Sequence, residues 1–227
     1  MKTLSDSNDE VVIYDLRVLA LICKPDGNIH FKPFMKSLYR LFKHDRNLLH
    51  TKGPYIIRQL SVYLSSVDIY QSMTEMIEDE QDLKFARLYV EYLNAIMFTA
   101  KELYYLREQI KKLETPVSHF DFNFLVKFKS IALKVSLHLQ ESRQLFQCLY
   151  KTWSHSQASI IGLVFLAGCY SHALDLVQAI SEQESTMEFL LELDRFVQIL
   201  ESGNWKKREF LEFCIHSYFV LQEFFHS

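Results

Sequence analysis

Residues 83–97 read LKFARLYVEYLNAIM. Coiled into a helix, this stretch is apolar on nearly every side, which indicates a helix buried at the centre of an all-helical fold. On its N-terminal side, Ser65 or Ser66 can cap a preceding helix. Pro54, after Gly53, suits the first turn of the helix before that one. The pattern around residues 83–97 therefore predicts one helix following another with short links.

The same rhythm continues on the C-terminal side. Thr99 with Glu102 has the pattern of a capping box and predicts a helix that Pro116 ends. Four more helices are predicted from apolar periodicity, over residues 145–153, 159–170, 172–180 and 187–200. Only five glycines and four prolines occur in 227 residues, about a third of average usage, so little of the chain is available for tight turns. We predict an all-α fold, an armadillo- or HEAT-like helical array (α-solenoid fragment).

Charge and cysteine usage exclude several classes of protein. The chain carries 25 basic and 28 acidic residues, without the basic excess of a nucleic-acid-binding surface. Its four cysteines are far apart and form no CxxC pair, which favours a reduced, cytoplasmic protein. The longest apolar run, residues 160–170, is far shorter than the ~20 residues of a membrane span. We therefore expect a soluble protein that reaches membranes only through partners.

The acidic run of residues 78–82, EDEQD, is the most enzyme-like feature. Asp79 and Asp82 could hold Mg²⁺ against a diphosphate, as in helical prenyl or terpene-type enzymes. Such a site needs a second acidic motif on a facing helix, and the sequence shows none. We interpret the run as a solvated link that favours the start of the next helix. The nine histidines form no HExxH motif or Cys/His cluster, so we expect no catalytic, cofactor-binding or metal-binding residues.

Several strings resemble a known family. Residues 9–12 (DEVV), 53–60 (GPYIIRQL) and 82–86 (DLKFA) resemble the C-terminal domain of the ArPIKfyve family, the vacuole-morphology scaffolds of the PIKfyve lipid-kinase complex. Further colinear matches lie within residues 102–107, 148–153, 172–176 and 189–198. The resemblance covers roughly residues 9–116 and 141–202, which we expect to form the helical scaffold domain after a polar segment over residues 1–8.

The resemblance implies a non-enzymatic scaffold that oligomerises. In the family, the domain gathers the PIKfyve kinase and a Sac-domain phosphatase, which together control phosphatidylinositol 3,5-bisphosphate on endosomal, lysosomal and vacuolar membranes. The long N-terminal HEAT array of the family has no counterpart in this sequence, so we expect a fragment of a longer scaffold. An unrelated helical-repeat trafficking adaptor is the alternative, and the Mg²⁺-dependent enzyme is a more distant one.

Two segments depart from the family. Residues 117–140 alternate apolar and polar side chains over 120–124 and 133–139, as strands do. Val117-Ser118 can be encoded by GTAAGT and Leu139-Gln140 by TTGCAG, so we expect a translated, retained intron; a genuine insertion forming a hairpin or an added helix is the alternative. Residues 203–227 are expected to form a divergent helical tail.

Overall fold

A computed structural model describes residues 2–23, 29–111, 137–182 and 187–202. Within these ranges every regular element is a helix, which confirms the all-α prediction. Contacts divide the chain into two compact units, Met1–Leu106 and Arg107–Ser227. No helix in the described ranges combines the length and apolarity that crossing a membrane requires.

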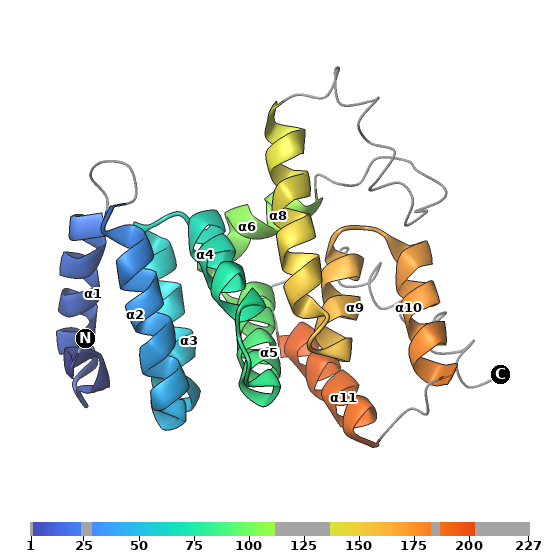
Figure 1. The fold of residues 1–227 in the computed structure, drawn as a ribbon, viewed down its shortest axis with the longest axis horizontal. Coiled ribbons are helices and arrows are strands. Elements are labelled where there is room, and N and C mark those ends of the chain that lie inside the picture. The colour runs from blue at the N-terminus through green and yellow to red at the C-terminus, as the bar shows by residue number, and fades with distance from the viewer. Residues whose placement is uncertain (1, 24–28, 112–136, 183–186, 203–227) are drawn as a thin grey trace. The chain divides into compact units, whose positions relative to one another are not determined.

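The first unit is a stack of helices in two layers. α1 contacts α3 and α3 contacts α5, while α2 contacts α4, and Figure 1 shows these helices side by side with their axes roughly aligned. Such contacts between every second helix are typical of helical arrays. The helices are η1 (Lys2–Ser5), α1 (Asp9–Cys23), α2 (Phe31–His44), α3 (Arg46–Tyr63), α4 (Ser66–Glu78), α5 (Leu83–Thr99) and η2 (Lys101–Leu103), followed by α6 (Tyr104–Lys111), in which the boundary between the units falls.

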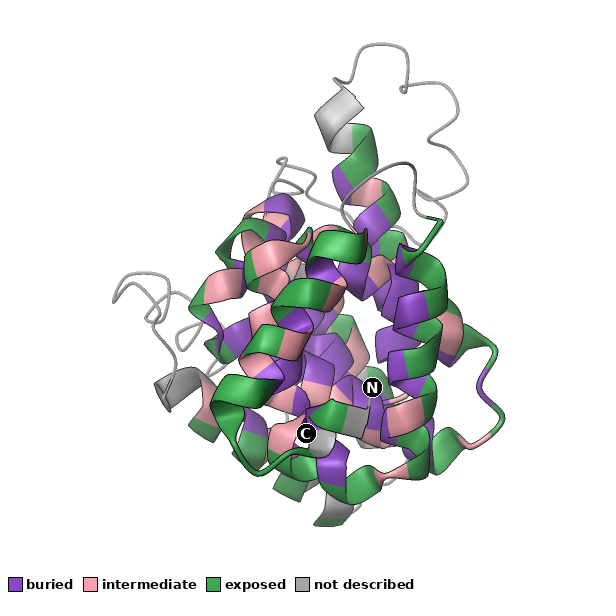
Figure 2. Cartoon of the chain, turned by 90° about the vertical axis from the view of Figure 1, so that its left-hand side faces the viewer, coloured by how far each residue is buried: buried purple, intermediate pink, exposed green. Residues whose placement is uncertain are grey.

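Helix α5 is buried along most of its length, as its sequence predicts. Phe85, Tyr89 and Leu93 are completely buried, and the Tyr70 hydroxyl of α4 donates a hydrogen bond of 2.9 Å to the Leu93 carbonyl oxygen. Figure 2 shows buried positions recurring on one side of each helix and exposed positions on the other. Leu83, at the beginning of α5, is exposed, so the burial starts one turn into the helix.

Two predicted helix starts are wrong. α3 begins at Arg46, because the Asp45 carboxylate accepts a hydrogen bond from Leu48 N at 2.9 Å, and Pro54 lies inside the helix. Thr99 ends α5 instead of capping the next helix, since its hydroxyl donates to the Ala95 carbonyl oxygen at 2.7 Å. Ser65, by contrast, caps α4 as predicted, accepting a hydrogen bond from the backbone N–H of Asp68.

The second unit is built around α9. Its helices are α8 (Leu137–Trp153), α9 (Gln157–Leu166), α10 (Tyr170–Glu182) and α11 (Met187–Ser202), and α9 contacts the other three. Every residue of α9 after Gln157 is buried. Gly162 permits a close approach, because a Cβ placed there would lie 2.9 Å from the Phe196 Cε2 atom of α11. Gly168, at φ 71°, ends α9 in the left-handed conformation that glycine favours.

Helix α8 begins earlier than its predicted start at residue 145. Ser142, Leu145, Leu149 and Trp153 are buried at a spacing of three to four residues, so one helical stripe runs through the whole element. The strand pattern over residues 133–139 is therefore wrong for residues 137–139, which are helical. Residues 117–136 of the suspected intron and the tail over residues 203–227 lie outside the described residues, so the predictions for them stay predictions.

Candidate functional site

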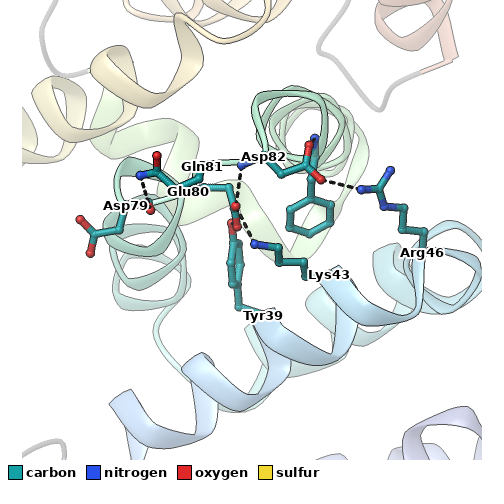
Figure 3. Close-up of polar contacts among 8 residues, drawn as sticks. Tyr39, Lys43, Arg46, Asp79, Glu80, Gln81 and Asp82 are labelled. Atoms are coloured by element: carbon teal, nitrogen blue, oxygen red, sulfur yellow. Dashed lines mark hydrogen bonds and ion pairs between the residues drawn. The ribbon is translucent and has the colours of Figure 1, made fainter.

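The acidic run over residues 78–82 lies at the link between α4 and α5, facing α2 (Figure 3). Its central member, Glu80, is 9% exposed. The Tyr39 hydroxyl donates to Glu80 Oε2 at 2.9 Å, and Lys43 Nζ donates to Oε1 at 2.6 Å. The backbone N–H of Asp82 also donates to Oε1, at 2.8 Å. The interpretation of this run as a solvated link is therefore wrong for Glu80, which is buried and bonded to three donors.

Charge and hydrogen bonding keep Glu80 ionised in this position. Burial by itself raises the pKa of its carboxyl group, since removal from water disfavours the charged form. Hydrogen bonds from Lys43, the Asp82 backbone and Tyr39 act in the opposite direction and prevail, so the pKa lies below its ordinary value. Burial and the neighbouring Glu80 carboxylate both raise the pKa of Tyr39, which keeps its hydroxyl a proton donor.

Asp82 has two structural roles at the start of α5. Its carboxylate caps the helix by accepting a hydrogen bond from Phe85 N at 3.0 Å. The same carboxylate pairs with Arg46 Nη2 at 2.7 Å, and the Arg46 guanidinium lies 5.7 Å from the centre of the Phe85 ring. The prediction that the acidic run favours the next helix start is confirmed for this residue.

The carboxylates do not converge as a diphosphate-bound Mg²⁺ site would require. Figure 3 shows the Asp79 side chain turned away from Glu80, while Asp82 points toward Arg46. Lys43 Nζ already lies against the Glu80 carboxylate. In the described ranges, no group of three or more histidine, cysteine, aspartate or glutamate side chains could hold a metal ion.

Beneath Glu80 lies a cluster of aromatic rings. The Tyr39 ring centre is 5.5 Å from that of Phe85 and 5.3 Å from that of Tyr89, both in edge-to-face geometry. Tyr89 is completely buried, and within the described part of the chain its hydroxyl has no hydrogen-bond partner. Two buried tyrosines in contact thus differ in one respect: only Tyr39 uses its hydroxyl on a charged acceptor.

The second unit contains a polar pair that sequence analysis missed. His172 Nε2 of α10 lies 2.8 Å from the Tyr150 hydroxyl of α8. Burial lowers the pKa of His172, although the carboxylate of Asp175 opposes this effect. A single histidine without a motif gave no signal, because its partner is 22 residues away in the sequence. The pair joins two helices that both contact α9, so its role in this geometry is structural.

Comparisons with known proteins give one family. Residues 46–210 match the family described as vacuolar protein 14 C-terminal Fig-4p binding. Over 202 residues the chain is 34% identical to the VAC14 homolog of Arabidopsis thaliana, covering 89% of this chain and 24% of that protein. The VAC14 homolog of Schizosaccharomyces pombe is 33% identical over 199 residues, covering 88% of this chain and 22% of that protein.

A more distant relative is vacuole morphology and inheritance protein 14 of Saccharomyces cerevisiae, 24% identical over 202 residues. The match covers 89% of this chain and 20% of the yeast protein. The chain thus spans a quarter or less of the length of these relatives. No solved structure matches the chain.

Proposed function

The chain belongs to the family of vacuolar protein 14 C-terminal binding domains, and from this membership we propose that it docks the family's partner, a Sac-domain phosphoinositide phosphatase. The observation that carries the proposal is the family match over residues 46–210, which includes α3, α4 and α5 and the described helices of the second unit. On this proposal the chain acts by presenting a surface and catalyses no reaction.

The wider assignment follows the resemblance to the PIKfyve-complex scaffolds. We propose that the domain self-associates, that it serves a complex containing a PIKfyve-type lipid kinase, and that this complex regulates phosphatidylinositol 3,5-bisphosphate. The chain would then be cytoplasmic and peripheral on endosomal, lysosomal or vacuolar membranes, held there by partners. The stacking of every second helix in the first unit supports an armadillo- or HEAT-like array.

The described surface offers a first place to look for the phosphatase contact. Tyr104 and Tyr105, adjacent at the start of α6, are 57% and 59% exposed and lie inside the family match. Exposed aromatic side chains are enriched among the residues that dominate binding energy at protein interfaces. We propose this pair as part of the docking surface.

The experiment is co-purification of the chain with the Sac-domain phosphatase, followed by measurement of the mass of the complex. We expect a stable complex that contains both proteins, and weaker capture by Tyr104→Glu/Tyr105→Glu. Val18→Glu, an exposed substitution ahead of the family match, is the control and should bind normally. Failure of the unchanged chain to retain phosphatase at micromolar concentrations would refute the docking proposal. Normal binding by the tyrosine variant would refute only the proposed contact.

A further inference from the structure

Helix α1 has two apolar faces. One face, with Val12, Leu16 and Ala20 at 1% exposure or less, is buried in the first unit, where α1 packs against α3. On the other side, large apolar residues 38–65% exposed recur every three or four positions and form what we call the outer stripe. Its members are Val11, Tyr14, Val18, Leu21 and Ile22.

The outer stripe is unusual for the end of a helical array. A terminal helix ordinarily turns a polar face to water, whereas an internal helix is apolar on both sides because it has a neighbour on each. Single exposed apolar residues are common on protein surfaces, but a contiguous row of five marks an interaction site. The short helix η1 contacts α1 as well, yet the stripe remains exposed beside it. Figure 2 views the chain from this side.

Charges along α1 argue against a lipid surface as the occupant. Glu10 and Arg17 lie on one flank of the stripe and Asp15 on the other, by their helical positions. Helices that lie on anionic membranes carry lysine and arginine on their polar face. The flanks of this stripe are acidic in excess, which suits a neighbouring helix with mixed charges.

The arrangement of the array indicates where that neighbour comes from. α3 contacts α1 before it and α5 after it, whereas in the described residues α1 has only the later neighbour of its layer, α3. The relatives are at least four times as long as the matched region, and the family model describes a C-terminal part of them. α1 precedes residue 46, where the family match begins.

We propose that the outer stripe of α1 is the docking face for a further amphipathic helix of the same array, of the kind contributed by the region that precedes this domain in its longer relatives. The helix would take the position two before α1 and cover the stripe as α3 covers the opposite face. The inference concerns residues outside the phosphatase-family match and does not depend on the proposed function.

A fusion tests the proposal. The ~80 residues that precede the matching region in the Arabidopsis VAC14 homolog, two repeats of ordinary size, are joined to this chain at the aligned position. Hydrogen exchange is then measured in residues 9–23. We expect at least tenfold slower exchange in the fusion than in the unfused chain, and loss of this slowing in Val18→Glu/Leu21→Glu. Val62→Glu on α3 is the matched control, because Val62 is 55% exposed and Val18 54%.

Each outcome decides. Exchange in α1 that is unchanged by the fusion, or equally slow in the Val18→Glu/Leu21→Glu fusion, overturns the proposal. Protection of α1 in the unfused chain that disappears on dilution identifies a second copy as the occupant and also overturns it. So does binding of the unfused chain to vesicles of anionic phospholipid that Val18→Glu abolishes. An unchanged urea midpoint for the unfused Val18→Glu/Leu21→Glu variant confirms that the substitutions leave the fold intact.

Discussion

Two buried tyrosines in contact provide the sharpest test of the Glu80 site. Tyr39→Phe removes a hydroxyl that donates to the buried Glu80 carboxylate at 2.9 Å. Tyr89→Phe removes a hydroxyl without a partner in the described part of the chain. Both changes keep the ring, and with it the 5.3 Å edge-to-face contact between the two residues. The comparison therefore isolates the hydrogen bond from the packing.

The expected magnitudes differ in size and sign. A hydrogen bond to a charged group contributes about 1.5–3 kcal/mol, so Tyr39→Phe is expected to destabilise the first unit by that amount. A buried hydroxyl without a partner costs free energy, so Tyr89→Phe is expected to leave stability unchanged or to raise it by about 1 kcal/mol. Urea unfolding gives the free energies, and hydrogen exchange in α2 and α5 localises the change to the first unit.

The pH dependence gives a second check on the same bond. The pKa of Glu80 is lowered in the folded chain, so its stabilising effect is present above the unfolded value of about 4.3 and is lost as the pH falls through the folded value. The cost of Tyr39→Phe should therefore be largest near pH 7 and smaller near pH 3. Equal costs for the two tyrosine variants at pH 7, or a larger one for Tyr89→Phe, would refute the reasoning.

Three further predictions concern other parts of the chain. Gly162→Ala forces a Cβ into the Phe196 ring and should destabilise the second unit by about 1–3 kcal/mol in urea unfolding. Asp82→Ala removes the cap of α5 and should cost about 1 kcal/mol in the same assay, whereas Asp82→Asn keeps a capping side chain and should cost less. The pKa of His172 is lowered by burial, so stability should fall as the pH drops below about 6.5; His172→Gln should remove this part of the pH dependence of the urea midpoint.

The apolar pattern predicts the helices well and their first residues less well. The burial of α5 follows from a stretch so apolar that no orientation leaves it in water. Pro54 misleads because Asp45 offers a cap nine residues earlier, and burial of Leu48 and Leu49 in the core favours the longer helix. Thr99 misleads because a local carbonyl oxygen competes for its hydroxyl. In both cases a plausible local signal is outweighed by a competing interaction.

The environment of Glu80 could not be predicted from local sequence. Its two side-chain donors, Tyr39 and Lys43, are 41 and 37 residues away and come from another helix. The sequence shows five polar residues in a row, and only the packing of α2 against α4 decides which of them enters the interior. Local spacing can place Asp82 before a helix and so identify it as a cap, because that role needs no distant partner.

The Glu80 network fixes how the helices of the first unit fit together. A buried ion pair is weak evidence for net stability, because the cost of removing its charges from water offsets their attraction. Apolar contacts between α2 and α4 tolerate small shifts along the helix axes, whereas a carboxylate bonded to Tyr39, Lys43 and the Asp82 backbone accepts a single register. We infer that the network specifies geometry more than it adds stability. A domain that works by presenting a surface needs that property, since each contact it offers a partner depends on the relative positions of its helices.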